Sequence, residues 1–156
     1  MDLLKIKESI KKHEGLKLKP YLCPKKKLTI GYGRNLEDRG ITQIEAETML
    51  ERDLLDIKLE LEDSIKFFYK LDHIRQNVLI EMAYNMGVPK LLNFKNTLEY
   101  MRKGDFINAS EEMLNSKWHR DFMEYDLKDG KRNNNGLLRS EYLSIVMREG
   151  VYEWNF

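Results

Sequence analysis

Glu14 is the side chain in this sequence best placed to act as an acid catalyst. Leu3, Ile6 and Ile10 recur at helical spacing, and Gly15 stands where a helix commonly ends, so Glu14 falls in the last turn of a predicted helix. The negative end of the helix dipole disfavours a carboxylate at this position, and a general acid must hold its proton until it donates it. An exposed glutamate at a helix end is the ordinary alternative.

Cys23 is the second candidate, because it is the chain's single cysteine and lies among five lysines at positions 17, 19, 25, 26 and 27. Cationic surroundings lower the pKa of a thiol and favour the thiolate, which is the form that acts as a base or nucleophile. The alternative is a small apolar side chain packed in a core. A single cysteine also excludes an intrachain disulfide and a multi-cysteine zinc site.

Metal and cofactor sites are not expected. The histidines at positions 13, 73 and 119 have no spacing typical of metal ligands. Gly31-Tyr32-Gly33 lacks the third glycine of a dinucleotide-binding loop, because Leu36 occupies that position. The sequence therefore predicts no metal and no cofactor.

The elements that must position these residues follow from hydrophobic periodicity and capping signals. A hairpin is predicted from Tyr21 through a turn at 24–27 to a strand at 28–33, and Thr29 is an ordinary strand residue there. A capping box at 42–45 begins a helix of about twenty residues. Further helices are predicted after Asp72 and over 94–102, 105–115 and 137–148, the last after a polar run at 130–136.

This order of elements predicts an α+β fold in a single domain spanning residues 1–156. A small β-sheet lobe of about 13–41 is joined by a long helix of about 42–64 to a larger all-helical lobe, which comprises 1–12 and about 65–156.

Composition narrows the choice of partners. The 156 residues carry 27 Lys and Arg against 26 Asp and Glu, a formal net charge of +1 that gives no reason to expect nucleic acid. No run of eighteen apolar residues predicts insertion into a membrane, and the first ten residues do not resemble a secretory signal, so we expect a cytoplasmic protein. Cations crowd the first 34 residues, which predicts either a solvated face or attraction to an anionic substrate such as a cell wall.

The spacing of three of these residues resembles the active-site signature of the phage lysozymes, or endolysins, of glycoside hydrolase family 24. Glu14, Cys23 and Thr29 are separated by eight and five residues, and Ile30-Gly31-Tyr32-Gly33 follows at once. Similar segments continue to residue 154, among them Gly40-Ile41-Thr42, Asn85-Met86-Gly87, Phe94 to Leu98, Ser116-Lys117-Trp118 and Arg139.

The resemblance implies a lysozyme-like fold and a monomeric muramidase that cuts the β-1,4 bond between N-acetylmuramic acid and N-acetylglucosamine in peptidoglycan. Glu14 would be the general acid, and Cys23 and Thr29 would hold and activate the attacking water, inverting the anomeric carbon. Arg139 matches an arginine that pairs with the catalytic glutamate. The positions implied to line the sugar-binding cleft are Asn35, Tyr84, Asn85 and Thr97.

Two positions depart from many family members, which carry Asp in place of Cys23 and His in place of Arg34. The resemblance also implies that Arg34 pairs with Asp53 on the long helix. Two other functions remain open: a lytic transglycosylase, which needs only the acid glutamate, or a degenerate lysozyme fold that only binds the wall. By the same resemblance, the protein would stay in the cytoplasm of an infected or lysogenic bacterium until a holin releases it to the wall.

Overall fold

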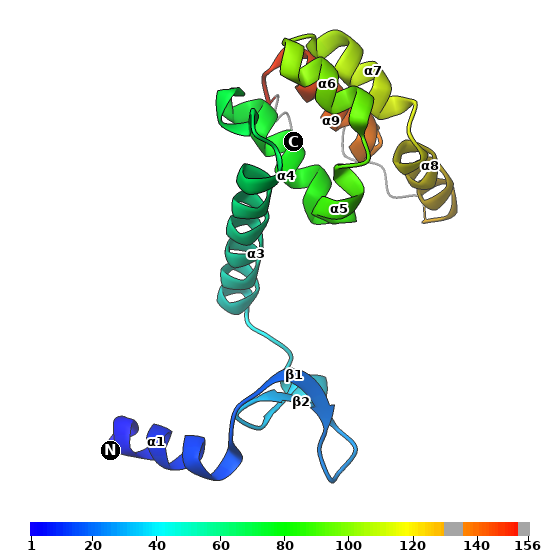
Figure 1. Cartoon of the computed structure of the whole chain (residues 1–156). Coiled ribbons are helices and arrows are strands. Elements are labelled where there is room, and N and C mark those ends of the chain that lie inside the picture. The colour runs from blue at the N-terminus through cyan, green and yellow to red at the C-terminus, as the bar shows by residue number, and fades with distance from the viewer. Residues whose placement is uncertain (130–135, 153–156) are drawn as a thin grey trace. The chain divides into compact units, whose positions relative to one another are not determined.

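The computed structural model describes residues 1–129 and 136–152. Within it the chain forms two compact units, Met1–Leu50 and Glu51–Phe156. Most of the polar run predicted at 130–136 lies outside the described residues. Figure 1 labels the helices and strands of both units.

The first unit contains helix α1 (Leu3–Glu14), a three-stranded antiparallel sheet and the short helix α2 (Leu36–Arg39). Asp2 caps the start of α1 by accepting a hydrogen bond from the Lys5 N–H, and Gly15 ends the helix at φ +66°. The sheet is ordered β1 (Lys17–Leu22), β2 (Leu28–Gly31) and β3 (Arg34–Asn35). The predicted end of the first helix and the predicted hairpin are both present.

The register of the sheet decides which side chains share a face. Tyr21 lies opposite Thr29, and Thr29 in turn lies opposite Asn35. Opposed residues in an antiparallel sheet project to the same side. Leu22 lies opposite Leu28, and both therefore project to the other side.

Helix α3 (Gln43–Ser64) begins in the first unit and continues into the second. The predicted capping box starts it: the Thr42 hydroxyl accepts from the Glu45 N–H at 3.2 Å, and the Glu45 carboxylate accepts from the Thr42 N–H at 2.8 Å. Leu61 near the end of α3 is fully buried in the core of the second unit.

The rest of the second unit consists of helices with short connections. They are η1 (Phe68–Lys70), α4 (His73–Met86), α5 (Val88–Leu91), α6 (Lys95–Lys103), α7 (Phe106–Leu114), α8 (Lys117–Asp129) and α9 (Arg139–Glu149). The most extensive contacts between helices are those of α7 with α6 and α9. Within the described residues, no helix combines the length and the apolar character needed to cross a membrane.

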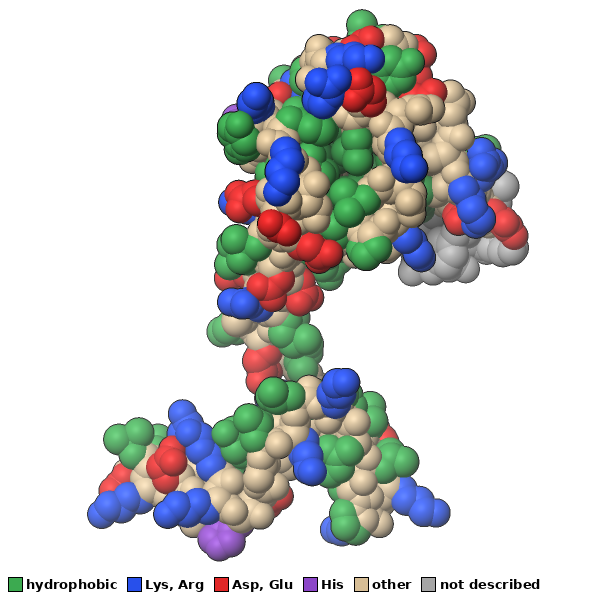
Figure 2. Space-filling model, viewed as in Figure 1, with side chains coloured by type: hydrophobic (Ala, Val, Ile, Leu, Met, Phe, Trp, Pro, Cys, Tyr) green, Lys and Arg blue, Asp and Glu red, His purple; other side chains and the backbone are tan. Residues whose placement is uncertain are grey.

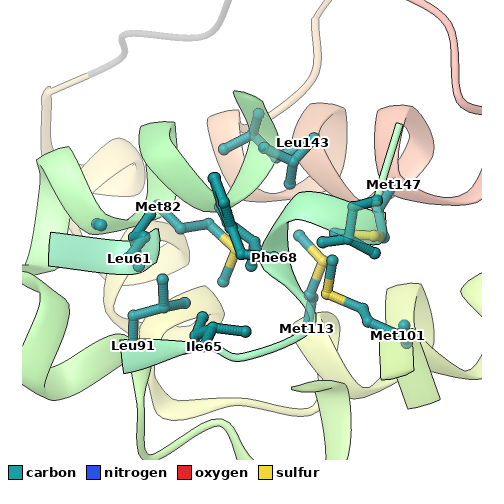
Figure 3. Packing of buried hydrophobic residues seen from close by; sticks show 14 of the residues in the cluster. Leu61, Ile65, Phe68, Met82, Leu91, Met101, Met113, Leu143 and Met147 are labelled. Carbon is teal, nitrogen blue, oxygen red and sulfur yellow. The ribbon is translucent and has the colours of Figure 1, made fainter. Parts of the chain in front are cut away.

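One hydrophobic core fills the second unit. Phe68 is surrounded there by aliphatic and methionine side chains from α3, α4, α7 and α9 (Figure 3). The buried residues of α4 include Val78, Leu79 and Met82. Methionines fill the irregular spaces between helices because their side chains are flexible.

The structure confirms the α+β fold class, a small sheet and a larger helical part. Four helices were not predicted: the short α2, η1 and α5, and the longer α8. Helix α2 is a single turn, and α8 carries charge at most positions, with Trp118 and Phe122 as its apolar pair four residues apart. The assignment of residues 1–12 to the helical lobe, within one domain, stays a prediction.

Candidate active site

Glu14, the predicted acid, lies at the end of α1 and places its carboxylate against the β2–β3 turn. A Cβ atom added to Gly33 would lie only 2.8 Å from Glu14 Oε2 and 3.2 Å from its carboxyl carbon. Gly33 has a φ of +76°, which residues with a side chain rarely adopt. The turn thus needs glycine for its backbone conformation and also for the approach of the carboxylate.

Cys23 lies at the opposite end of strand β2, where β1 turns into β2. The turn is closed by a hydrogen bond from the Cys23 N–H to the Lys27 carbonyl at 3.0 Å and by one from the Lys26 N–H to the Cys23 carbonyl at 2.8 Å. Lys26 has a φ of +59°, an unusual conformation for a residue with a side chain. This tight turn fixes the position of the half-buried thiol.

Hydrogen bonds lower the pKa of the Cys23 thiol. The Lys27 backbone N–H donates to the sulfur and contributes most, partial burial acts in the opposite direction, and the Lys25 N–H and the Thr29 hydroxyl also favour the thiolate. The Thr29 hydroxyl has one proton, which it donates to the Lys27 carbonyl at 2.9 Å. The hydroxyl must rotate to donate to the sulfur instead, so it lowers the pKa of the thiol less than the Lys27 N–H does.

The lysine side chains themselves act less on the thiol than the sequence suggested. The Lys27 ammonium is directed to α2, where it lies 3.2 Å from Glu37 and 3.1 Å from Asp38. Glu37 also accepts a hydrogen bond from the Leu28 N–H at 2.9 Å. Backbone amides of the turn, rather than its ammonium groups, stabilise the thiolate.

Asn35, predicted to contact sugar, shares a sheet face with Thr29. Its side chain is engaged locally, because Oδ1 accepts from the Asp38 N–H at 3.0 Å and Nδ2 donates to the Asp38 carboxylate at 2.8 Å. Asn35 therefore caps α2, a role that its position before a single-turn helix explains. The structure brings Cys23, Thr29 and Asn35 together around strand β2.

Arg34 pairs with Glu45 in this structure, and its Nε donates to the Gly40 carbonyl at 2.9 Å. The partner expected from the sequence, Asp53, belongs to the other unit, and that pairing stays a prediction. Glu45 already faces back toward the hairpin because it closes the capping box of α3, so its carboxylate is the one presented to Arg34.

The second unit carries the remaining predicted residues. Asn85 lies at the end of α4, where its Oδ1 accepts from Trp118 Nε1 at 2.9 Å. The Trp118 ring makes edge contacts with Phe94 and Phe122, at centroid distances of 6.3 and 5.4 Å. These aromatic rings line a pocket of about 730 Å³, together with Asn85, Met86, Lys90, Lys117 and Asp121.

Thr97 lines an adjoining pocket of about 340 Å³ and is almost completely buried, which leaves little of it for contact with a ligand. Polar groups with more access to this pocket are Asn96 and Glu112, which hydrogen bond to each other at 3.1 Å. Sequence reasoning did not single out this pair. Tyr84 is exposed on α4 and lines neither pocket.

Arg139, at the start of α9, donates from Nε to Glu81 Oε1 at 2.9 Å. Glu81 was missed in the sequence. The sequence did contain a signal for it, because Glu81, Tyr84 and Asn85 fall three and four residues apart within the stretch 78–86, which is otherwise apolar. The predicted pairing of Arg139 with Glu14 stays a prediction.

The described residues contain no cluster of three or more histidine, cysteine or acidic side chains arranged to hold a metal ion. The side chains described above offer a carboxyl group, a polarised thiol and hydroxyl, and a pocket of aromatic rings edged with amides. Such a set is suited to acid-catalysed cleavage of a carbohydrate.

Comparison with known proteins agrees with this assignment. The phage lysozyme family matches residues 11–140. A probable T4-type lysozyme 1 of Dictyostelium discoideum is 30% identical over 143 residues, covering 73% of this chain and 84% of the relative. An endolysin of Acyrthosiphon pisum secondary endosymbiont phage 1 is 32% identical over 113 residues, covering 70% and 73%.

A third relative is the pre-baseplate central spike protein Gp5 of Enterobacteria phage T4, which is 27% identical over 140 residues. The match covers 72% of this chain but 24% of that protein. Fold and site thus define a glycosidase of the lysozyme type, which acts on peptidoglycan. The chain belongs to the phage lysozyme family.

Proposed function

We propose that this lysozyme is a muramidase that hydrolyses the β-1,4 bond between N-acetylmuramic acid and N-acetylglucosamine. The observation that carries the proposal is the position of Glu14, whose carboxyl group lies against Gly33 in the family's signature segment. Glu14 donates its proton to the leaving glycosidic oxygen, so that the bond to the anomeric carbon breaks without expelling an alkoxide.

The attacking water is held by Cys23 and Thr29. Cys23 is the more accessible of the two, since Thr29 is only 3% exposed. The thiolate accepts a proton from the water, and Thr29, which donates its own proton to the Lys27 carbonyl, offers a lone pair to the same water. Water attacks the face opposite the leaving group, and the anomeric configuration inverts.

The second unit binds the glycan. The pocket bordered by Trp118, Phe94 and Asn85 is large enough for sugar rings, and its aromatic faces suit the apolar faces of pyranose rings. Asn35, Tyr84, Asn85 and Thr97 are proposed to border the bound strand, and Arg139 is proposed to pair with Glu14. The protein acts as a monomer without a cofactor.

The experiment is digestion of purified peptidoglycan followed by mass spectrometry of the products. A muramidase leaves a reducing N-acetylmuramic acid end, and water is incorporated. Glu14→Gln should keep the thermal midpoint and lose about 10² to 10⁴ of the rate, since the amide has the shape of the acid but no proton to donate. Glu8→Gln, at another exposed glutamate of α1, is the matched control and should keep full activity.

Other outcomes would overturn the proposal. A 1,6-anhydro product would identify a lytic transglycosylase, and binding to peptidoglycan without any product would identify a wall-binding protein. A well-folded Glu14→Gln variant with more than about a tenth of the rate would remove Glu14 as the acid.

Its place in the cell is part of the same proposal. The chain is proposed to stay in the cytoplasm of an infected or lysogenic bacterium until a holin opens the membrane. Added from outside, the protein should then lyse permeabilised cells and leave intact cells of the same strain unaffected. Lysis of intact cells at the same rate would contradict this route.

A further inference from the structure

The sheet of the first unit carries a concentration of positive charge that the proposed catalysis does not use. Residues 15–34 contain six lysine and arginine side chains and no acidic one. Lys27 is paired with Glu37 and Asp38, and Arg34 with Glu45. The other four cations are exposed and have no ion pair among the described residues: Lys17, Lys19, Lys25 and Lys26.

Exposed leucines lie among these lysines. Leu18 is 79% exposed, Leu22 is 65% exposed and Leu28 is 38% exposed. The register places Leu22 directly opposite Leu28, so these two form one apolar surface across β1 and β2. Figure 2 shows hydrophobic and basic side chains next to one another on this unit. Lys17 lies opposite Gly31 and projects to the side of Thr29, and Lys19 alternates with Leu18 along β1. We therefore define the Lys–Leu patch by the exposed leucines and the two lysines of the β1–β2 turn: Leu18, Leu22, Lys25, Lys26 and Leu28.

The Leu22–Leu28 pair faces away from the candidate catalytic residues. Tyr21 and Thr29 project to one side of the sheet, and Leu22 and Leu28, one position along each strand, project to the other. A partner held by these leucines therefore leaves the face of Thr29 open. Pro20 in the edge strand β1 has no N–H to donate, which disfavours pairing with a further strand.

We propose that the Lys–Leu patch binds the surface of an anionic lipid bilayer. The ammonium groups of Lys25 and Lys26 attract phosphate headgroups, and the exposed leucines enter the boundary between headgroups and acyl chains. A soluble polyanion would neutralise the lysines but would leave the leucines in water, so the combination favours a lipid surface. The contact is peripheral, with the backbone of the hairpin remaining in the headgroup layer.

The test measures binding of the full chain to phosphatidylcholine vesicles with and without phosphatidylglycerol, by co-sedimentation at increasing salt. Binding should require phosphatidylglycerol and weaken with salt. Lys25→Glu/Lys26→Glu should reduce affinity by about 25-fold or more, because each basic residue near an anionic surface contributes roughly 5-fold. Lys66→Glu/Lys70→Glu makes the same change in net charge in the second unit and should retain most of the affinity.

A second pair of variants tests the leucines. Leu18→Ser/Leu22→Ser should weaken vesicle binding by roughly tenfold with every charge intact, whereas Leu55→Ser/Leu59→Ser, at exposed leucines of α3, should not. Circular dichroism and thermal midpoints verify that all four variants fold.

Several results would overturn the proposal. Absence of binding to phosphatidylglycerol vesicles would do so directly. Equal losses in the patch and control variants would show an effect of net charge alone. Unchanged vesicle binding by Leu18→Ser/Leu22→Ser, with equally tight binding to inorganic polyphosphate, would assign the patch to polyanions. Dimerisation of the free protein that this variant abolishes would assign it to a second copy of the chain.

Discussion

At the scale of single residues, the least usual feature of this lysozyme is a cysteine in the position where many family members carry aspartate. A carboxylate is ionised at neutral pH without assistance, whereas a thiol needs help. Here the help comes from backbone N–H groups of Lys27 and Lys25, which the tight β1–β2 turn directs at the sulfur. The turn geometry, more than the lysine charges, prepares Cys23 for its proposed role.

The lowered pKa of Cys23 predicts how the reactivity of the thiol depends on pH. The rate of alkylation by iodoacetamide should rise with pH, with a midpoint below 9.0, the usual pKa of a thiol, because the folded chain stabilises the thiolate.

Substitutions test the role of Cys23 in catalysis. Cys23→Ser should lose most lytic activity, and Cys23→Asp should retain much of it, since aspartate is an anion at neutral pH and serine is not. Full activity after quantitative alkylation would show that Cys23 takes no part in catalysis.

Gly33 allows a test of whether the Glu14 carboxylate must lie where the structure places it. Gly33→Ala should lower activity by at least about tenfold, because the new methyl group would lie 2.8 Å from Glu14 Oε2 and must displace it. Gly31→Ala is the matched control, since Gly31 has a φ of +69° and open space around it. Both variants should lose about 1 to 2 kcal/mol of stability from backbone strain.

The comparison of the two glycine variants separates strain from contact. Steady-state lysis and thermal midpoints of both proteins provide the measurements. If Gly31→Ala lost as much activity as Gly33→Ala, backbone strain in the hairpin would explain the loss. The close approach of Glu14 to Gly33 would then have no separate effect on activity.

Sequence reasoning singled out Glu14, the proposed acid, and the residues around β2, but not the hydrogen bonds and ion pairs that some of them make. Spacing located Glu14, Cys23 and Thr29 because the three signature positions lie within sixteen residues of one another in the sequence. The pairing of Arg34 with Glu45, and that of Arg139 with Glu81, depends on which of many similar charges the folded chain brings near. A chain in which about a third of the residues are charged offers too many partners for sequence to choose among.

At the scale of elements, the helices that the sequence predicted are those with clear ends and an apolar stripe. Gly15 caps the C-terminal end of α1 and Gly87 that of α4, both at positive φ. Helix α8 was not predicted, because apolar residues do not recur clearly at helical spacing in its sequence. Trp118 holds α8 against Phe94 through a contact between distant parts of the chain, which local spacing does not reveal.

The end of α9 depends on an arginine from another helix. The Arg75 guanidinium donates from Nε to the Met147 carbonyl and from Nη2 to the Arg148 carbonyl, both at 3.0 Å. The same group lies 3.6 Å from the centroid of the Phe106 ring and pairs with Asp72. One side chain thereby satisfies two carbonyls at a helix end and packs three helices together.

Replacing Arg75 should destabilise the second unit. Arg75→Ala should cost about 3 kcal/mol, because two charge-assisted hydrogen bonds and the stacking on Phe106 are lost together. Arg75→Lys should recover little, since an ammonium group lacks the planar fork that reaches both carbonyls. Urea unfolding followed by circular dichroism measures the change, and a loss below about 0.5 kcal/mol would show that water replaces the cap.

At the scale of the whole molecule, burial is divided unevenly between the two units. Every buried hydrophobic residue that the structure describes lies at Leu61 or later in the chain. In the first unit Thr29 is buried, while α1, β1 and α2 have no buried residue. Since hydrophobic burial is the main source of stability, the second unit carries most of the free energy of folding.

This division predicts unequal local stability, which hydrogen exchange on the full chain can measure. Amides of α4, α7 and α9 should exchange only on global unfolding, whereas those of α1 and β1 should exchange through local opening and therefore faster. A bound chitooligosaccharide should slow exchange in residues 14–35, because a ligand that binds only the ordered hairpin stabilises it by mass action. A maltooligosaccharide, which lacks acetamido groups, is the control and should change nothing. If the hairpin amides of the free protein exchanged as slowly as those of α4, the first unit would not be less stable than the second. Buried hydrophobic contacts of the sheet would then be needed to explain its stability.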